Sequence, residues 1–206
     1  MAFHPFGLID MSNGEQDQKI IKNTLATLER YGSDLWCGYS FSWLGNLKAR
    51  AFDGAGAAEA LKIFATCFCL PNSFHVNGDQ TKSGKSKFTY RPFTLEGNFA
   101  FAAGIQEMLL QSHTGIVHLF PAIPASWKDV EFSSLRAEGA FLISATRSHG
   151  QVYVVKFVSE KGGRLRLLNP FEFPYTMDGK WRRTKEDIIE IEMKPGQTVR
   201  LDAHDE

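Results

Sequence analysis

The stretch "FTLEGNFAFAAGIQEMLLQS", residues 93–112, decides the fold, because helical patterns lie before it and strand patterns lie after it. Four of its residues recur at helical spacing and predict one helix: Phe99, Ala103, Gln106 and Leu110. Asn98 is a favourable N-cap residue and Gly97 frees the backbone, so we expect the helix to begin beside them. Glu96 then stands directly before the helix.

Three further helical patterns precede this stretch and predict successive antiparallel helix hairpins. They are "EQDQKIIKNTLATLERYG" (15–32), "YSFSWLGNLKARAFDG" (39–54) and "GAAEALKIFATCFCL" (56–70). More than 20 residues without clear periodicity, 71–93, separate the third helix from the fourth. Loops of this length are usually functional or disordered, so two interpretations stay open: a solvated basic loop, or a lid or rim beside a ligand cleft.

The pattern becomes strand-like after residue 115. Glycine turns separate three alternating stretches, which predict an antiparallel meander: "AFLISATR" (140–147), "QVYVVKFVSE" (151–160) and "RLRLLNPF" (164–171). Two more strands, "DIIEIEM" and "QTVRLD", flank the turn dipeptide Pro195-Gly196. We therefore predict an α plus β chain, with a helical part in residues 1–118 and an antiparallel β-sandwich-like domain in residues 119–206.

Composition limits the classes of function. The chain has 206 residues and a net charge of +0, which gives no electrostatic case for binding nucleic acid or an anionic membrane surface. Cys37, Cys67 and Cys69 lack the spacing of a zinc site and are predicted to be buried free thiols. There is no apolar run of about 20 residues for a membrane span, and the N-terminal residues lack a signal-peptide pattern. No metal or other cofactor is predicted.

Two kinds of residue are candidates for chemistry. Glu96 would lie beside the positive end of a helix dipole, which favours an ionised carboxylate. Such a group suits a general base or a hydrogen-bond acceptor, although acidic residues at helix starts also serve only to stabilise the helix. Trp36, Tyr39 and Trp43 could stack on a sugar face or belong to the hydrophobic core.

A resemblance to a known family bears on this choice. The segment "EGNFAFAAGIQEMLLQSHTGIVHLFPAIPASW" (96–127) closely resembles a part of glycoside hydrolase family 95, which contains inverting α-L-fucosidases and related α-L-galactosidases. The family form has Asp-Gly-Asn-Phe-Gly, a helix ending in Met-Leu-Leu-Gln-Ser, a proline-rich connector and a Trp. The segments "GYSFSWLGNLKARAFDGAGAAEAL" (38–61) and "SSLRAEGAFLISA" (133–145) resemble further parts, so the similarity covers roughly residues 31–171.

This resemblance implies a fold and a mechanism. The chain would hold the last hairpins of an (α/α)6-type barrel and the C-terminal β domain of a longer, secreted or periplasmic enzyme. The family inverts, with a Glu as general acid. Its base is a water activated by asparagine side chains, which an Asp polarises, and inversion needs room for that water. Glu96 stands at the Asp position, whereas the acid and the asparagines belong to earlier segments, so this chain alone is expected to be inactive.

Departures from the family pattern in two places, at residue 96 and within residues 36–39, affect the predicted site. Glu96 is one methylene longer than Asp, Tyr39 replaces a Trp, and Trp36-Cys37 replaces His-Thr. The predicted site thus has Glu96 as the catalytic residue, with a substrate-binding group that consists of Trp36, Tyr39, Trp43, Asn98 and His75. The expected partners are a fucosylated or L-galactosylated glycan and a second copy of the chain, bound through an exposed helical face. The alternative is a non-catalytic carbohydrate-binding or structural module.

Overall fold

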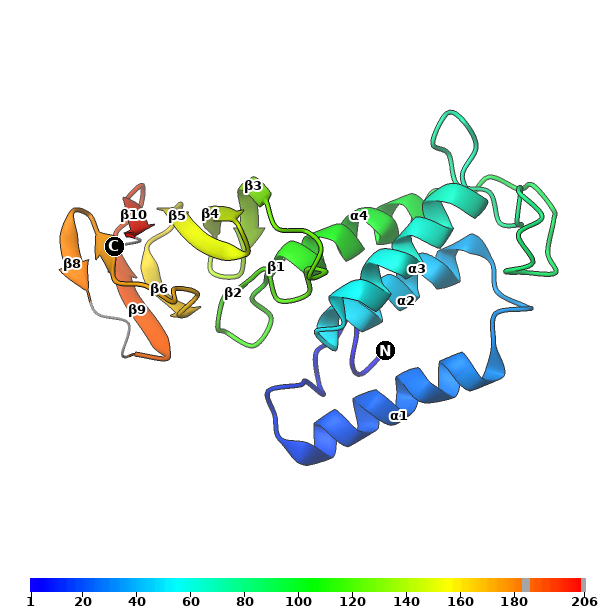
Figure 1. Cartoon of the computed structure of the whole chain (residues 1–206), viewed down its shortest axis with the longest axis horizontal. Helices are drawn as coiled ribbons and strands as arrows, with labels where there is room; N and C mark the ends of the chain where they lie inside the picture. Colours follow the sequence, from blue (N-terminus) through cyan, green and yellow to red (C-terminus); the bar gives the residue numbers. More distant parts are fainter. Residues whose placement is uncertain (183–185, 205–206) are drawn as a thin grey trace. The chain divides into compact units, whose positions relative to one another are not determined.

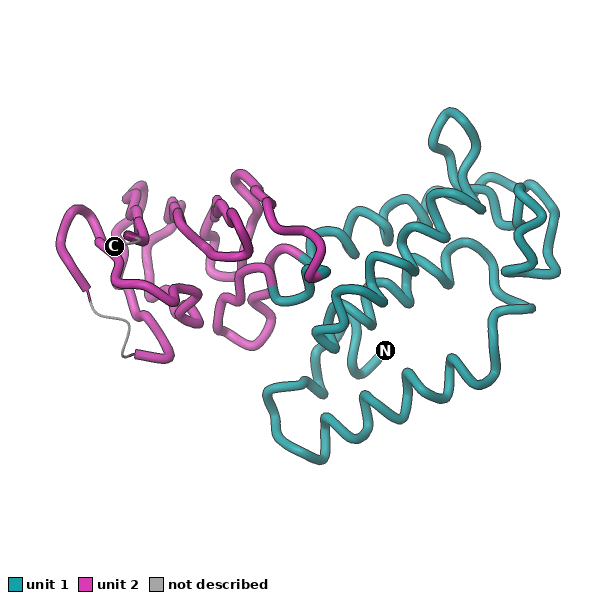
Figure 2. Tube along the Cα trace, viewed as in Figure 1, with its two compact units in different colours: residues 1–108, 121–124 teal, residues 109–120, 125–206 magenta. Residues whose placement is uncertain are grey.

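The computed structural model describes residues 1–182 and 186–204, and the chain forms two compact units (Figure 2). Unit 1 comprises residues 1–108 and 121–124, and unit 2 comprises residues 109–120 and 125–206. Unit 1 is helical and unit 2 is built from antiparallel strands, which confirms the predicted α plus β class. No helix in the described residues is both long enough and apolar enough to cross a membrane.

Unit 1 contains four helices, each close to its predicted range (Figure 1). They are α1 (Glu15–Tyr31), α2 (Gly38–Arg50), α3 (Gly54–Cys67) and α4 (Glu96–Leu109). Asp53 caps α3, because its Oδ1 accepts a hydrogen bond from the backbone N of Gly56 at 2.8 Å. Leu110 was predicted to continue the fourth helix, but it lies in a short strand instead.

Helices α2, α3 and α4 pack closely because small residues line their contacts. A Cβ added to Gly45 of α2 or Gly104 of α4 would lie 2.7 or 2.9 Å from the side chain of Leu61 on α3. Between α2 and α4, Nδ2 of Asn46 donates to the carbonyl oxygen of Ala100 at 2.8 Å.

A buried ion pair completes the contact between α2 and α4. Nη2 of Arg50 lies 2.8 Å from Oε1 of Glu107, and both side chains are largely buried. Asn46 of α2 contacts Ala100 of α4, and Arg50, later in α2, contacts Glu107, later in α4. Therefore α2 and α4 run in the same direction, and their N-termini lie at the same end of unit 1.

Helix α1 packs through a separate hydrophobic cluster of unit 1. Its centre is formed by Phe3, Ile21 and Leu47, and Leu25, Leu28 and Trp43 pack against it. On α1, the spacing of Ile21, Leu25 and Leu28 is that of a single helix face.

The segment between α3 and α4 contains only isolated β-bridges, which join Cys69 to His75 and Val76 to Phe93. It is anchored at Asp79, which is 3% exposed and accepts hydrogen bonds from Thr81 and Ser83 at 2.8–2.9 Å. Its lysines, by contrast, are exposed. A loop with a buried polar anchor and an exposed basic surface is compatible with both sequence interpretations.

The described residues of unit 2 form ten strands, and Figure 1 shows their arrangement. They are β1 (Leu110–Gln111), β2 (His118–Leu119), β3 (Val130–Ala137), β4 (Phe141–Ser148), β5 (Gln151–Ser159), β6 (Gly163–Leu168), β7 (Tyr175–Met177), β8 (Lys180–Arg182), β9 (Ile188–Met193) and β10 (Thr198–Ala203). A six-stranded sheet has the order β3-β4-β5-β10-β7-β8, and β6-β9 and β1-β2 form two-stranded sheets.

The predicted meander is correct for its first two strands and wrong for the third. β4 and β5 form a hairpin in which Phe141 is opposite Ser159, but the other neighbour of β5 is β10. β6 pairs with β9 instead, with Leu165 opposite Ile191. Gly162 and Gly163 have φ values of 77° and 121°, and this backbone directs the chain out of the large sheet after β5.

The six-stranded sheet and the β6-β9 pair contribute to one hydrophobic core. The six-stranded sheet supplies Ile143, Val155, Phe157 and Leu201, and the β6-β9 pair supplies Leu165, Leu167, Ile189 and Ile191. These residues are at most 6% exposed, and they alternate with exposed positions along β6 and β9. This alternation is the pattern of strands that bury one face and leave the other in solvent.

Candidate functional site

Glu96 lies in the first turn of α4 and its side chain is exposed. The helix begins at Glu96 itself, with the carbonyl oxygen of Leu95 accepting a hydrogen bond from the backbone N of Asn98 at 3.0 Å. The prediction that Asn98 caps the helix is therefore wrong. Its Oδ1 accepts instead from the backbone N of His75 at 3.0 Å, and its Nδ2 donates to the carbonyl oxygen of Ser73 at 2.9 Å.

His75 is fully buried directly beneath this helix start. Its Nδ1 lies 2.7 Å from the carbonyl oxygen of Thr94 and 2.9 Å from Oγ1 of the same residue. A carbonyl oxygen only accepts, so Nδ1 carries a hydrogen and donates it. Oγ1 of Thr94 in turn donates to Oδ1 of Asn77 at 3.0 Å. Within the described residues, Nε2 of His75 has no hydrogen-bond partner.

Two glycines leave the space that the imidazole ring fills. A Cβ added to Gly38, the first residue of α2, would lie 2.3 Å from Nε2 of His75. A Cβ added to Gly97 of α4 would lie 2.3 Å from Nδ1. The ring of Phe64 on α3 packs against the same imidazole with centroids 5.0 Å apart. His75 is thus held between the N-termini of α2 and α4.

Burial lowers the pKa of His75, since desolvation disfavours the imidazolium form. The hydrogen bond to the Thr94 carbonyl and the negative charge of Glu96 act in the opposite direction, but they do not outweigh burial. The imidazole is therefore neutral at neutral pH, with its hydrogen on Nδ1.

The three aromatic candidates have different surroundings. Trp36 packs edge-on against Phe41, with centroids 5.3 Å apart, and Trp43 belongs to the cluster around α1. The side chain of Tyr39 is 39% exposed and follows Gly38 at the start of α2. Tyr39 therefore lies at the same end of unit 1 as Glu96, whereas Trp36 and Trp43 pack in separate hydrophobic clusters.

Trp36 also lines a surface hollow of about 400 Å³, which falls within the size range of ligand pockets. Tyr31 and Leu35 provide apolar walls, and Asp34 and Lys87 form an ion pair of 2.7 Å there. Glu96 is not among the residues that line this hollow.

Two aromatic residues near Glu96 were missed by the sequence analysis. Phe74 and Phe93 stack with their centroids 4.9 Å apart, and they are 50% and 52% exposed. They directly precede His75 and Thr94, the two residues that hydrogen-bond to each other. Their positions in a loop without periodicity gave no signal, although the aromatic content of that loop was visible.

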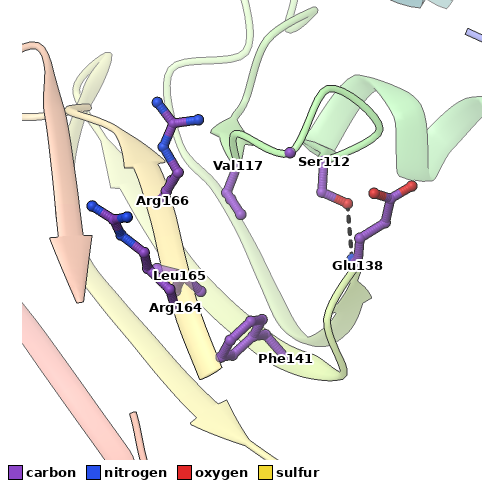
Figure 3. Close-up of a pocket in the computed structure, with 8 residues that line it drawn as sticks. Ser112, Val117, Glu138, Phe141, Arg164, Leu165 and Arg166 are labelled. Carbon is purple, nitrogen blue, oxygen red and sulfur yellow. Dashed lines mark hydrogen bonds between the residues drawn. The ribbon is translucent and has the colours of Figure 1, made fainter. Parts of the chain in front are cut away.

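Unit 2 has a small cavity that does not fit a sugar (Figure 3). It encloses about 30 Å³, roughly the room for one water molecule. Oγ of Ser112 accepts a hydrogen bond from the backbone N of Glu138 at its edge, and Arg164 on β6 forms an ion pair with Glu190. The described residues contain no group of three His, Cys, Asp or Glu that would hold a metal ion. Cys37, Cys67 and Cys69 are free thiols; Cys67 is buried as predicted, whereas Cys37 and Cys69 are half-buried.

Comparison with known proteins agrees with this division of the chain. Residues 1–109 match the glycosyl hydrolase family 95 catalytic domain, and residues 111–201 match the family 95 C-terminal domain. The two matches place the chain in the glycoside hydrolase class, which belongs to carbohydrate metabolism. The chain belongs to glycoside hydrolase family 95, as the sequence resemblance indicated.

A curated protein and a solved structure are among the proteins similar to this chain. Alpha-L-fucosidase 2 of Arabidopsis thaliana is 30% identical over 162 residues, which are 77% of this chain and 19% of that protein. The chain thus spans about a fifth of the length of this relative. A GH127 β-L-arabinofuranosidase from Geobacillus stearothermophilus T6 matches over 78% of this chain and 28% of its own, with 12% identity and a TM-score of 0.29.

Proposed function

We propose that this chain forms part of an inverting glycoside hydrolase that acts on α-L-fucosides or related α-L-glycosides. Residues 1–118 would supply the last hairpins of its (α/α)6-type catalytic barrel, and residues 119–206 its C-terminal β-sandwich domain. The family matches in chain order and the fucosidase relative support this proposal. The parallel course of α2 and α4 also fits a ring of helix hairpins, in which alternate helices share one direction.

The position of Glu96 is the single observation that carries the catalytic part of the proposal. Its exposed side chain begins α4, where the family has an aspartate, and a helix start stabilises negative charge. We assign Glu96 to the base side of the reaction, where it polarises the group that activates the attacking water. The general acid and the water-holding asparagines would come from other segments of the enzyme. The 206-residue chain alone is then inactive, because most of the transition-state stabilisation is missing.

The substrate-binding group keeps its predicted assignment within this proposal. Tyr39 is the candidate for direct contact with the sugar, since its exposed ring and Glu96 lie at the same end of unit 1. Trp36 offers part of its ring to the surface hollow. Trp43, Asn98 and His75 would support the binding surface through their packing and hydrogen bonds.

The reaction itself is tested with the full-length enzyme that carries these residues. Aryl α-L-fucoside and aryl α-L-galactoside are incubated with it, and ¹H NMR follows the first sugar product. The proposal expects release of the β-anomer before mutarotation, which is the outcome of inversion. Absence of hydrolysis of both substrates, or first release of the α-anomer, would contradict the proposal.

A second candidate function is non-catalytic carbohydrate binding, which the hollow lined by Trp36 favours. Calorimetric titration of the 206-residue chain with L-fucose, L-galactose and fucosylated glycans tests this function. Trp36→Ala is the informative variant, and Trp181→Ala is its control, because Trp181 lies on β8 in unit 2 and is 61% exposed. Binding that Trp36→Ala removes would support the module; no heat at millimolar sugar would reject it.

Self-association through the helical part is also part of the proposal. Five apolar side chains around the start of α4 are 41–65% exposed: Phe74, Tyr90, Phe93, Leu95 and Phe99. Apolar surface of this kind commonly marks a protein-binding face. Light scattering of the 206-residue chain is expected to report a dimer or larger species, and Phe99→Ser is expected to shift it toward the monomer. A monomer at all concentrations would exclude this face as a self-association site.

A further inference from the structure

We infer that His75 is a positioning residue that fixes Glu96 and Tyr39 relative to each other, through one ring held between the starts of α2 and α4. This inference rests on the proposed function, because it assigns His75 a role in placing the proposed catalytic carboxylate. It does not require contact between His75 and a sugar, and the ring is in fact fully buried.

His75 contacts the backbone on both sides of Glu96. Two residues before it, the carbonyl oxygen of Thr94 accepts from Nδ1 of His75 at 2.7 Å. One residue after it, Gly97 packs against the same ring. Two residues after it, Oδ1 of Asn98 accepts from the backbone N of His75 at 3.0 Å. His75 therefore contacts the chain immediately before and immediately after Glu96.

His75 also contacts the start of α2. Gly38 packs on the opposite edge of the imidazole, at Nε2, and its backbone N donates to the carbonyl oxygen of Asn77 at 3.1 Å. Tyr39 is the next residue along the helix. Because α2 and α4 contact the same ring, the width of that ring sets the separation of the two helix starts, and hence of Tyr39 and Glu96.

The hydrogen bond at Nδ1 accounts for a histidine at position 75. Nε2 is buried without a partner among the described residues, which is an unfavourable arrangement that a purely apolar ring would avoid. An apolar ring would lack the donor at Nδ1. This donor provides a hydrogen bond to the carbonyl oxygen of Thr94. The histidine is thus accounted for by the hydrogen bond that orients the residues before Glu96.

The contacts of His75 would affect the proposed reaction through the location of the Glu96 carboxylate. Among the described residues, the Glu96 carboxylate accepts no hydrogen bond, so its location depends on its backbone. Displacements near 1 Å in a preorganised site reduce rates by up to about 100-fold. A change at His75 should therefore act mainly on kcat, through Glu96, without removing a sugar contact.

Two variants separate positioning from general loss of structure. His75→Asn keeps an N–H close to the position of Nδ1, whereas His75→Leu keeps apolar bulk and removes the donor. In the full-length enzyme, we expect His75→Leu to lower kcat on aryl α-L-fucoside by about 10- to 100-fold with KM changed less than about 3-fold. His75→Asn should recover most of that loss. Equal kcat values for the two variants would overturn the inference.

A readout without catalysis keeps the inference separate from the proposed function. In ¹H-¹⁵N spectra of the 206-residue chain, His75→Leu should shift the backbone amide signals of both Glu96 and Tyr39, and His75→Asn should shift them much less. Signals that do not distinguish the two variants would overturn the inference. If instead the shifts follow this pattern but Glu96→Gln leaves kcat unchanged, the positioning role stands and the proposed function fails.

Discussion

Nδ1 of His75 and the carbonyl oxygen of Thr94 lie 2.7 Å apart, and this hydrogen bond joins the loop after α3 to the start of α4. Thr94 precedes Glu96 by two residues, and the ring of His75 also contacts Gly97. One buried side chain thus holds the backbone on both sides of the proposed catalytic carboxylate. This relationship leads to predictions about stability, pH dependence and activity.

Replacing Gly97 with Ala should destabilise unit 1. The added methyl group would lie 2.3 Å from Nδ1 of His75, so the ring or the helix must move. Overpacking of this kind costs about 1–3 kcal/mol. Urea unfolding of the 206-residue chain measures the effect, and Ala103→Ser on the exposed face of α4 is the control. Equal unfolding midpoints for the two variants would show that the space beside His75 is not tight.

Replacing Glu107 with Gln should destabilise the contact between α2 and α4. Arg50 and Glu107 form an ion pair whose side chains are 7% and 17% exposed. Removal of one partner leaves a buried charge, which costs about 3–5 kcal/mol. Urea unfolding followed by circular dichroism measures the loss. The exposed pair of Asp34 and Lys87 provides the control, because Asp34→Asn should change the free energy of unfolding little. Equal losses of stability in Glu107→Gln and Asp34→Asn would contradict the prediction.

Folding stability should depend on pH through His75. Its folded pKa lies below the ordinary value, so the unfolded state binds more protons in the window between that lowered pKa and about 6.5. Stability therefore rises with pH through this window and is complete above it. Glu96 on α4 is the charged group that faces the ring; the contacts from α2 and α3 are the uncharged Gly38 and Phe64.

The measurement compares two chains, because other histidines also titrate. The free energy of unfolding is determined at pH 5.5 and 7.5 for the native chain and for His75→Asn. The native chain should gain more stability between these values than the variant. A gain of the same size in both chains would mean that His75 does not titrate differently in the folded state.

A second pH effect should come from Asp79 in the loop before α4. Burial acts to raise the pKa of Asp79, but hydrogen bonds from Ser83 and Thr81 outweigh it and hold the pKa below its ordinary value. Its stabilising contribution is present above the unfolded pKa of about 3.9 and is lost as pH falls through the folded pKa. Asp79→Asn should therefore destabilise the chain at pH 7, and the difference from the native chain should shrink at pH 2–3. A difference that is constant with pH would exclude this mechanism.

Local patterns in the sequence were sufficient to predict the four helices and five of the ten strands in the described residues, namely β4, β5, β6, β9 and β10. The four helices follow from residues three and four positions apart, and α1 ends directly before Gly32, the last residue of its predicted range. β3 was missed because its alternation is interrupted: the register shifts between Phe132 and Leu135, and Ser134 has a φ of 56°. A local interruption of this kind hides a strand from any test of period two.

Long-range pairing was not predictable from those patterns. β5 pairs with β4 and with β10, and not with β6, the strand that follows it along the chain. The pairing of each strand depends on which sheet buries its apolar face. In the candidate site, Glu96 could be identified from its turn and from the family pattern. His75 and Thr94 are 19 positions apart in a loop without periodicity, so no local sequence pattern predicted their hydrogen bond.

The most direct test of the account is the kcat of Glu96→Gln in the full-length family 95 enzyme, on aryl α-L-fucoside and aryl α-L-galactoside. Glu59→Gln, at an exposed position of α3, is the matched control. We predict that Glu96→Gln lowers kcat at least about 100-fold while Glu59→Gln leaves it unchanged, since base-side groups contribute factors of this size. A Glu96→Gln enzyme that turns over both substrates at the native rate would contradict the catalytic role of Glu96.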